Sequence, residues 1–337
     1  MKGKSQCINF KIFYALCLLV PVVLTGGCGN KDGDQGKIFR IAYVMAPGGT
    51  SHAGAEKIKK ILENDSRLDM KVKLYPNGIL GKDRELMEGL KLNGLDMVIG
   101  GPSIIGAYAP EYQLLEAPFL FRDYHHLQKV LHGPVGQELE TEMAEQYGFH
   151  YLGYFLRGPR YLTTTNQIVQ KPEDLHGMKL RVPELDIYIK SWELFGANPT
   201  PLAFSDMFMA LRQGVVDGQE NPLEVIYTNN LHEVQKYVME TDHLLSFYIL
   251  AVGDGYFTRF SRDESMIIQE AIDQAVQYHD NLMEEYERKY RQEIEASGVK
   301  FIKVDRQAFE KLANEKLPEV FKDQWKAGVY DSIKNTN

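Results

Sequence analysis

The sequence is poor in cysteine, and the positions of its cysteines exclude several kinds of site. All three lie near the amino terminus, at Cys7, Cys17 and Cys28. The rest of the chain therefore has no thiol for a disulfide, a cysteine nucleophile or a thiolate metal ligand. A lone Cys28 beside a processing point fits attachment of a lipid better than a redox role.

Enzyme motifs are lacking as well. The sequence has no G-x-S-x-G elbow, no H-E-x-x-H and no glycine-rich phosphate loop. Its nine histidines show no metal spacing with other ligands, so each is interpreted as a surface or helix-capping residue. Asp217 and Glu220 resemble an acid–base couple, but a proline-bounded strand end with interleaved Gly and Asn favours hydrogen bonding. We expect a protein that is not an enzyme and has no cofactor or metal.

The apolar run 12–24 is about 13 residues long, which is short of the roughly 20 that a membrane span needs. Basic residues precede the run and small residues follow it, so the segment 1–27 is predicted to be a secretory signal. The small residues that end in Cys28 resemble a lipobox, in which that cysteine receives the lipid. The alternative is ordinary cleavage without a lipid.

Basic residues do not dominate the chain once the predicted signal is removed. The net charge is −8, and the lysines of the signal, Lys2, Lys4 and Lys11, contribute +3, so the rest carries −11. This acidity argues against a nucleic acid as partner. A buried pocket can still hold an anion, because the pocket responds to its own few charges. Polar residues make 28–37 a flexible tether, and the body of about 300 residues is long enough for two domains.

The body alternates strands and helices, which predicts parallel-type α/β sheets with helices on their faces. The predicted strands are 38–44, 70–75, 95–99, 149–156, 161–165, 178–182, 198–200, 215–219, 246–253 and 299–304. The predicted helices are 53–64, 83–92, 124–147, 184–195, 205–212 and 262–297, with a helical tail through Trp325. A break at Gly158 marks the crossover between two lobes. Lobe I comprises 38–158 plus 246–286, and lobe II comprises 159–245 plus 287–337.

The predicted helix 262–297 is unusually long. Its apolar residues recur every three or four positions, and at 1.5 Å per residue it would extend about 50 Å. This is longer than one lobe is wide, so the helix either forms a coiled coil or lies across both lobes. A pair of shorter helices is the alternative.

Arg181 is the strongest candidate for binding, because it lies in an apolar run with Leu180, Val182 and Pro183. A half-buried arginine needs a counter-charge, which either an internal acid or a ligand can supply. Its guanidinium fork matches a carboxylate in two parallel hydrogen bonds. Residues alone leave the structural ion pair and the ligand contact equally open.

Several segments, in the right order, resemble the solute-binding subunits of tripartite ATP-independent periplasmic (TRAP) transporters. The resemblance covers the chain from about Ile38 to Trp325. It rests on the strings LYPNGILG at 74–81, APFLF at 117–121, LHGMKLRVP at 175–183, PTP at 199–201 and VDGQENP at 216–222. The family has two α/β lobes joined by a hinge, with a long helix spanning both, which is the fold class expected here.

The resemblance also implies roles for individual residues. Arg181 matches the arginine that holds the ligand carboxylate, and Asn221 matches a residue that binds the same group. Arg160 falls near the second arginine of the family. Its spacing to Arg181 is one residue longer than in the sialic-acid binders, so Arg157 is a possible substitute. Phe204 matches a residue that packs on the ligand.

Asp83 matches a polar contact from the other lobe, and the alternative for it is a helix N-cap. The pattern over 199–222 is nearest to the sialic-acid binders, but Val44 and Gly101 stand where those proteins present polar side chains. The expected ligand is therefore sialic acid, a C4-dicarboxylate, another sugar acid or a keto acid. The resemblance implies an extracytoplasmic binding protein that serves a membrane permease, and a sensor that signals to a membrane receptor is the alternative. With the lipobox-like segment at Cys28, we expect a lipid-anchored monomer.

Overall fold

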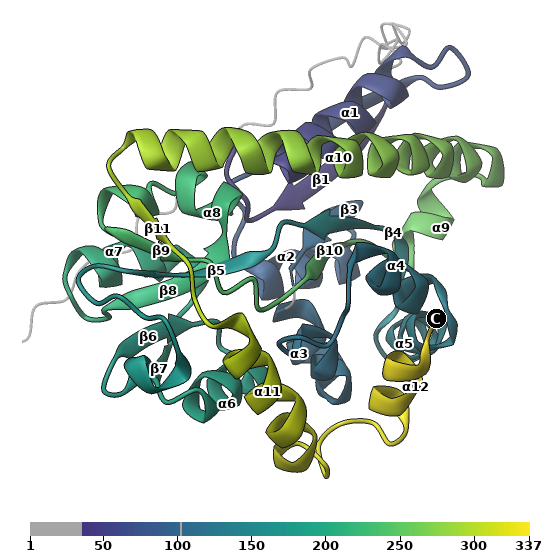
Figure 1. The fold of residues 1–337 in the computed structure, drawn as a ribbon. Coiled ribbons are helices and arrows are strands. Elements are labelled where there is room, and N and C mark those ends of the chain that lie inside the picture. The colour runs from purple at the N-terminus through teal and green to yellow at the C-terminus, as the bar shows by residue number, and fades with distance from the viewer. Residues whose placement is uncertain (1–35, 102) are drawn as a thin grey trace, which may run out of the picture. The chain divides into compact units, whose positions relative to one another are not determined.

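The computed structural model describes residues 36–101 and 103–337 and contains two β-sheets (Figure 1). The predicted signal, most of the tether and Cys28 lie outside the described residues. Each sheet is the centre of one lobe, and helices cover the sheets, so the predicted two-lobe α/β fold is confirmed.

The sheet of lobe I has the strand order β2-β1-β3-β10-β4. Its strands are β1 (Lys37–Tyr43), β2 (Met70–Tyr75), β3 (Met97–Gly100), β4 (Phe149–Arg157) and β10 (Ser246–Gly253). β1 is parallel to β2 and β3, whereas β10 is antiparallel to β3 and β4.

The sheet of lobe II has the order β11-β9-β5-β8-β6-β7. Its strands are β5 (Arg160–Thr164), β6 (Lys179–Val182), β7 (Asn198–Pro201), β8 (Gly218–Pro222), β9 (Tyr237–Met239) and β11 (Lys300–Ile302). β6 is parallel to β7 and β8, but β5 is antiparallel to β8 and β9. Both sheets therefore contain the expected parallel pairs, but each also contains antiparallel pairs that the sequence did not predict. Both β5 and β10 follow a crossover between the sheets, so no helical crossover within one sheet fixes their direction.

The helices surround these sheets. They are α1 (Thr50–Asn64), α2 (Asp83–Lys91), α3 (Ser103–Tyr108), α4 (Tyr124–His132), α5 (Pro134–Tyr147), α6 (Asp186–Leu194), α7 (Met207–Arg212), α8 (Leu223–Thr228), α9 (Gly255–Arg259), α10 (Arg262–Ala296), α11 (Arg306–Val320) and α12 (Val329–Asn335). The 3-10 turns are η1 (Pro110–Glu116), η2 (Pro172–Leu175), η3 (Phe204–Asp206) and η4 (Leu231–Glu233). The single helix predicted over 124–147 is two helices, because Pro134 has no N–H to continue the first one.

The long helix α10 spans both lobes, as predicted (Figure 1). It begins at a capping box in which Ser261 and Glu264 exchange hydrogen bonds. Its first half packs Ile268 and Ala275 into the core of lobe I. Its second half packs Tyr290 and Ile294 into the core of lobe II.

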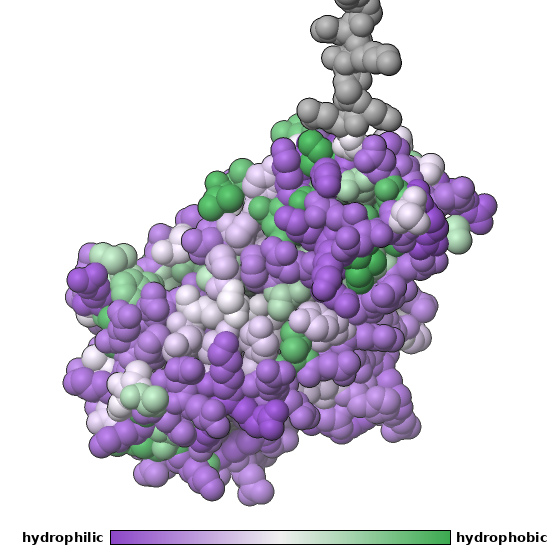
Figure 2. Space-filling model, turned by 90° about the horizontal axis from the view of Figure 1, so that it is seen from above, coloured by the Kyte–Doolittle hydropathy of each residue, from purple (hydrophilic) through white to green (hydrophobic). Residues whose placement is uncertain are grey.

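The carboxyl-terminal helices contact both lobes, since α11 packs against α6 and α12 against α5. The exact lobe boundaries given above remain a prediction. The face seen in Figure 2 is mostly hydrophilic, with hydrophobic residues scattered across it. Within 36–101 and 103–337, the structure has no helix that is both long and apolar enough to span a membrane.

Candidate functional site

Arg181 lies on β6 between β7 and β8 and is only 2 % exposed. Its Nε and Nη2 both donate to the carbonyl oxygen of Leu202, at 3.1 and 2.8 Å. No carboxylate among the described residues lies within ion-pair distance of this guanidinium, so an internal acid is not its partner. Burial lowers the pKa of Arg181 to about 10. A buried charge without an ionic partner is stabilised when an anion binds beside it.

Arg160 is in the opposite situation, because Glu220 on the neighbouring strand β8 occupies its fork. Arg160 Nε lies 2.5 Å from Glu220 Oε2 and Nη2 lies 2.6 Å from Oε1, and both side chains are buried. His243 Nε2 lies 3.1 Å from the same carboxylate. Burial alone would raise the pKa of Glu220, but Arg160 outweighs it and lowers that pKa to about 2. Glu220 is thus a structural ion-pair partner, and Asp217 is not coupled to it but accepts from the Lys179 amide at 2.9 Å.

Arg157 ends β4 and is also buried. Its guanidinium carbon lies 4.5 Å from the centre of the Tyr248 ring. Its Nε is buried without a hydrogen-bond partner. The sequence gives Arg160 and Arg157 as candidates for a second contact with the ligand. Of these two, Arg157 is the one whose guanidinium forms no ion pair with a carboxylate of the described residues.

Two buried residues, Tyr188 and Glu116, connect these arginines and were missed by the sequence analysis. Tyr188 Oη donates to Glu116 Oε2 at 2.6 Å, and Ser246 Oγ donates to Oε1 at 2.7 Å. Burial raises the pKa of Glu116, while Arg157 and Arg160 oppose that rise. The one sequence signal was a lone acid, Glu116, in an apolar run. Three buried arginines thus share this region with the carboxylates of Glu116 and Glu220, and only Arg160 forms an ion pair with one of them among the described residues.

Asn221 and Phe204 lie in the same lobe as Arg181. Asn221 on β8 is buried, and its Nδ2 donates to Gln219 Oε1 at 2.6 Å. Gln219 is the direct register partner of Arg181. Phe204 begins η3, two residues after the carbonyl that holds Arg181, and packs against the core of lobe II. The sequence-predicted residues of lobe II therefore gather on adjoining segments.

Asp83 lies in lobe I, where it interacts with the charge of Arg157. It is the first residue of α2, and Lys82 is the N-cap, so the capping alternative for Asp83 was wrong. Ser103 Oγ donates to its Oδ2, and Oδ1 is buried without a partner. Burial raises the pKa of Asp83, while Ser103 and the Arg157 charge oppose the rise.

Gly101 lies in van der Waals range of this carboxylate. A Cβ at that position would lie 4.0 Å from Asp83 Oδ2 and 3.9 Å from the Tyr248 ring. The Arg157 guanidinium lies over the Tyr248 ring, so Asp83, Tyr248 and Arg157 are neighbours in lobe I.

Several histidines differ from expectation. His126, His243 and His279 are buried, so their interpretation as surface or capping residues was wrong. His126 Nε2 lies 2.9 Å from the carbonyl oxygen of Ile333, and the His279 ring stacks on Phe155 at 4.2 Å. In the part of the chain that the structure describes, no group of three His, Cys, Asp or Glu side chains is arranged to hold a metal ion.

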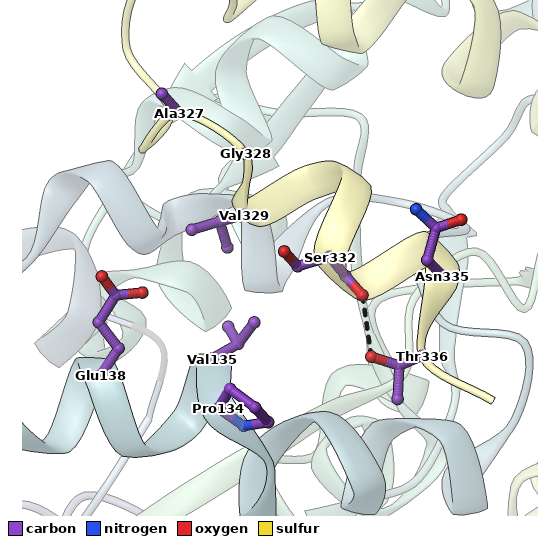
Figure 3. A pocket seen from close by; sticks show the side chains of 9 residues that line it. All are labelled: Pro134, Val135, Glu138, Ala327, Gly328, Val329, Ser332, Asn335 and Thr336. Carbon is purple, nitrogen blue, oxygen red and sulfur yellow. Dashed lines mark hydrogen bonds between the residues drawn. The ribbon is translucent and has the colours of Figure 1, made fainter.

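Two cavities lie away from Arg181. One of about 380 Å³ is bordered by α5 and α12, and its only charged lining residue is Glu138 (Figure 3). The other, of about 320 Å³, lies beside the crossover at Gly158 and Pro159, with Glu284, Glu287 and Arg288 of α10 on its wall. The first has no cation to receive an acid.

Comparison with known proteins agrees with this geometry. Residues 41–324 match the model of the family described as bacterial extracellular solute-binding protein, family 7. A solute-binding protein of Roseobacter denitrificans is 35 % identical over 264 residues, which are 78 % of this chain and 81 % of that protein.

Solved structures extend the likeness to the fold. A TRAP periplasmic solute-binding protein of Roseobacter denitrificans with bound L-galactonate has a TM-score of 0.81 at 31 % identity, covering 89 % of this chain and 98 % of that one. One from Sulfurospirillum deleyianum with bound succinate has a TM-score of 0.83 at 27 % identity, covering 89 % and 99 %. The chain therefore belongs to family 7 of the bacterial extracellular solute-binding proteins, the solute-binding subunits of TRAP transporters.

Proposed function

We propose that this protein binds an organic acid outside the cytoplasm and delivers it to the membrane permease of a TRAP transporter. The observation that carries the proposal is the buried guanidinium of Arg181, which no carboxylate of the described residues neutralises. A ligand carboxylate at Arg181 supplies the missing charge through two parallel hydrogen bonds. Asn221 donates to the same carboxylate, and Phe204 packs on the body of the ligand.

Arg157 is the second arginine that contacts the ligand. Arg160 has a structural role in the site, through its ion pair with Glu220. This assignment follows from the hydrogen bonds, since Glu220 takes both Nε and Nη2 of Arg160. Arg157 Nε has no partner. Each charge-assisted hydrogen bond to a bound carboxylate contributes about 1.5–3 kcal/mol.

The ligand class that fits best is a polyhydroxylated monocarboxylate, that is, a sugar acid. Asp83 presents a carboxylate from the lobe opposite Arg181, and its Oδ1 has no donor within the described residues. A ligand hydroxyl can donate to Asp83, whereas the second carboxylate of a dicarboxylate would face a like charge. Among the relatives, one binds L-galactonate, and another binds succinate. The charge of Asp83 is our reason for preferring sugar acids to C4-dicarboxylates as ligands of this protein.

Binding and release depend on closure of the two lobes. The open form admits the acid, Arg181 takes its carboxylate, and lobe I then excludes water from the charged hydrogen bonds. Release requires a permease that binds the open form better than the closed one, because a partner shifts only states that it binds differently.

A thermal-shift screen tests the proposal. The panel contains L-galactonate, N-acetylneuraminate, succinate and a keto acid, 2-oxoglutarate. At 100 times its dissociation constant, an acid that binds raises the free energy of unfolding by about 2.7 kcal/mol. The Arg181→Ala variant is the matched control and should show no shift. If no carboxylate in a broad panel shifts the wild type, the proposal is wrong.

We also propose that a lipid on Cys28 anchors the protein to the membrane. This site lies outside the described residues, and its support is the sequence pattern around it. Cys28→Ser is expected to release the protein from the membrane fraction, as measured by fractionation and immunoblotting. Retention of that variant in the membrane fraction would contradict lipidation.

A further inference from the structure

The segment Gly48–Thr50, which leads into α1, contacts two elements of the other lobe. Thr50 Oγ1 donates to Glu224 Oε2 of α8 at 2.6 Å. Tyr290 Oη of α10 donates to the carbonyl oxygen of Gly48. α1 packs Ala55 into the core of lobe I, whereas α8 and Tyr290 belong to the core of lobe II. These two hydrogen bonds therefore join the lobes.

The amino end of α1 suits a carboxylate from outside the helix. α1 has no side-chain N-cap and no acidic residue in its first turn. Four backbone N–H groups at a helix start lack helical partners, and the helix dipole favours a negative charge there. Glu224 brings such a charge beside Gly49 and Thr50. The other lobe thus supplies the carboxylate that α1 lacks.

Glycine at position 49 is what permits this approach. A Cβ there would overlap the carboxylate of Glu224. Gly48 adopts a φ of 99°, in the region that favours glycine. Both glycines therefore fit a chain segment that passes close to the opposite lobe.

We propose that Thr50, Glu224 and Tyr290 form a closing latch that sets the fraction of molecules with the lobes closed, and that Glu224 is its principal positioning residue. The effect on ligand affinity rests on the proposed function. Glu224 forms no hydrogen bond with Arg181, Arg157 or Asp83, so it acts through lobe position and not by touching the acid. Because the closed form holds the acid more tightly than the open form, the apparent affinity falls as the closed fraction falls.

A second pair between the lobes provides a contrast. Lys82 Nζ lies 3.8 Å from Asp206 Oδ2, but both side chains are about 60 % exposed. Exposed ion pairs of this kind contribute little. Thr50, in contrast, is only 4 % exposed, so its hydrogen bond is shielded from water. Asp206→Asn is therefore a matched control for variants of the latch.

The test measures the distance between the lobes directly. Spin labels on Ile79→Cys and Met209→Cys, which replace exposed residues, report the separation in the full chain after its three native cysteines are changed to serine. The variants are Glu224→Ala, Thr50→Val, Thr50→Ser and Asp206→Asn. Each is measured without acid and with L-galactonate, and the affinity for L-galactonate is measured by calorimetry.

We expect Glu224→Ala and Thr50→Val to reduce the short-distance population and to weaken L-galactonate binding about tenfold, because they lose a hydrogen bond to a charged group. Thr50→Ser keeps the hydroxyl and should match the wild type, and Asp206→Asn should stay within about twofold. The latch is refuted if the Glu224→Ala and wild-type distance distributions coincide both with and without L-galactonate. If no acid binds, the proposed function fails, yet the label distances without acid still test the latch.

Discussion

At the scale of the residue, two buried arginines of lobe II have opposite surroundings. Arg160 is neutralised by Glu220 inside the protein, whereas the one hydrogen-bond acceptor of Arg181 among the described residues is the carbonyl oxygen of Leu202. The first arrangement stabilises the fold. The second leaves a charge that a bound carboxylate can neutralise, so the two arginines should respond differently to mutation.

Glu220→Gln is expected to destabilise the protein by about 3–5 kcal/mol, because it leaves the buried Arg160 unpaired. The pKa of Glu220 is about 2 in the folded protein against an ordinary 4.5, so its stabilisation is fully present above pH 4.5. That stabilisation is lost as the pH falls toward 2. Urea unfolding at pH 6 and pH 3 should therefore show a smaller gap between wild type and variant at pH 3. An equal gap at both values would contradict the ion-pair assignment.

Asp83→Asn is expected to change selectivity more than fold stability. The amide keeps an acceptor for a sugar hydroxyl but removes the like charge that opposes a second ligand carboxylate. The ratio of succinate affinity to L-galactonate affinity should rise about tenfold in calorimetry. Ser103→Ala, which removes only the neighbouring hydroxyl, is the control. An unchanged affinity ratio in Asp83→Asn would show that Asp83 does not determine ligand specificity.

Sequence alone identifies some of these residues and not others. The apolar neighbours of Arg181 already indicate a charge that needs a partner. Glu116 and Tyr188 are 72 positions apart, and their hydrogen bond follows only from the packing of η1 against α6. Whether Arg160 meets Glu220 or a ligand depends on the register of β5 against β8, which spacing cannot give.

At the scale of the element, the helix α10 contains a buried acid. Glu287 faces the crossover between the lobes, with Gly158 and Tyr124 on the same cavity wall, and its Oε1 has no hydrogen-bond partner. Burial raises the pKa of Glu287 to about 7, with Tyr161 opposing the rise. Ionisation of Glu287 therefore destabilises the packing of α10 in the folded protein.

Glu287→Gln is expected to stabilise the protein at alkaline pH. The folded pKa of about 7 lies above the ordinary 4.5, so the stability is fully present below pH 4.5 and is lost as the pH rises through 7. At pH 8 the variant should gain up to about 2 kcal/mol, and at pH 4.5 it should gain almost nothing. Thermal unfolding at both pH values checks this, with the exposed Glu284→Gln as control. A gain that is equal at both pH values would show that ionisation of Glu287 is not its cause.

Periodicity fixes some elements well. The apolar repeat of 262–297 predicts α10 to within one residue of its observed end at Ala296, because a regular buried stripe needs an unbroken helix. The direction of a strand relative to its neighbours is harder to predict from the sequence. Nothing within β5 or β10 distinguishes a parallel from an antiparallel neighbour, since both strands are buried along their whole length.

At the scale of the whole molecule, two crossovers and the shared helix α10 connect the two lobes. Arg157 ends a strand of lobe I, Arg181 lies on a strand of lobe II, and the hydrogen bonds of Thr50 and Tyr290 join the lobes at α1. Closure therefore combines the free energy of a bound acid with that of contacts between the lobes. The acidic net charge of the chain is compatible with the proposed anion binding, because the proposed site contains buried arginines.

The most direct test of the account is the calorimetric affinity of Arg181 variants for the acid that gives the largest thermal shift. We expect no detectable binding in Arg181→Ala and at least tenfold weaker binding in Arg181→Lys, because an ammonium cannot form the bidentate pair. Circular dichroism should show that both variants are folded. Unchanged affinity in both variants would contradict the claim that Arg181 binds the ligand carboxylate.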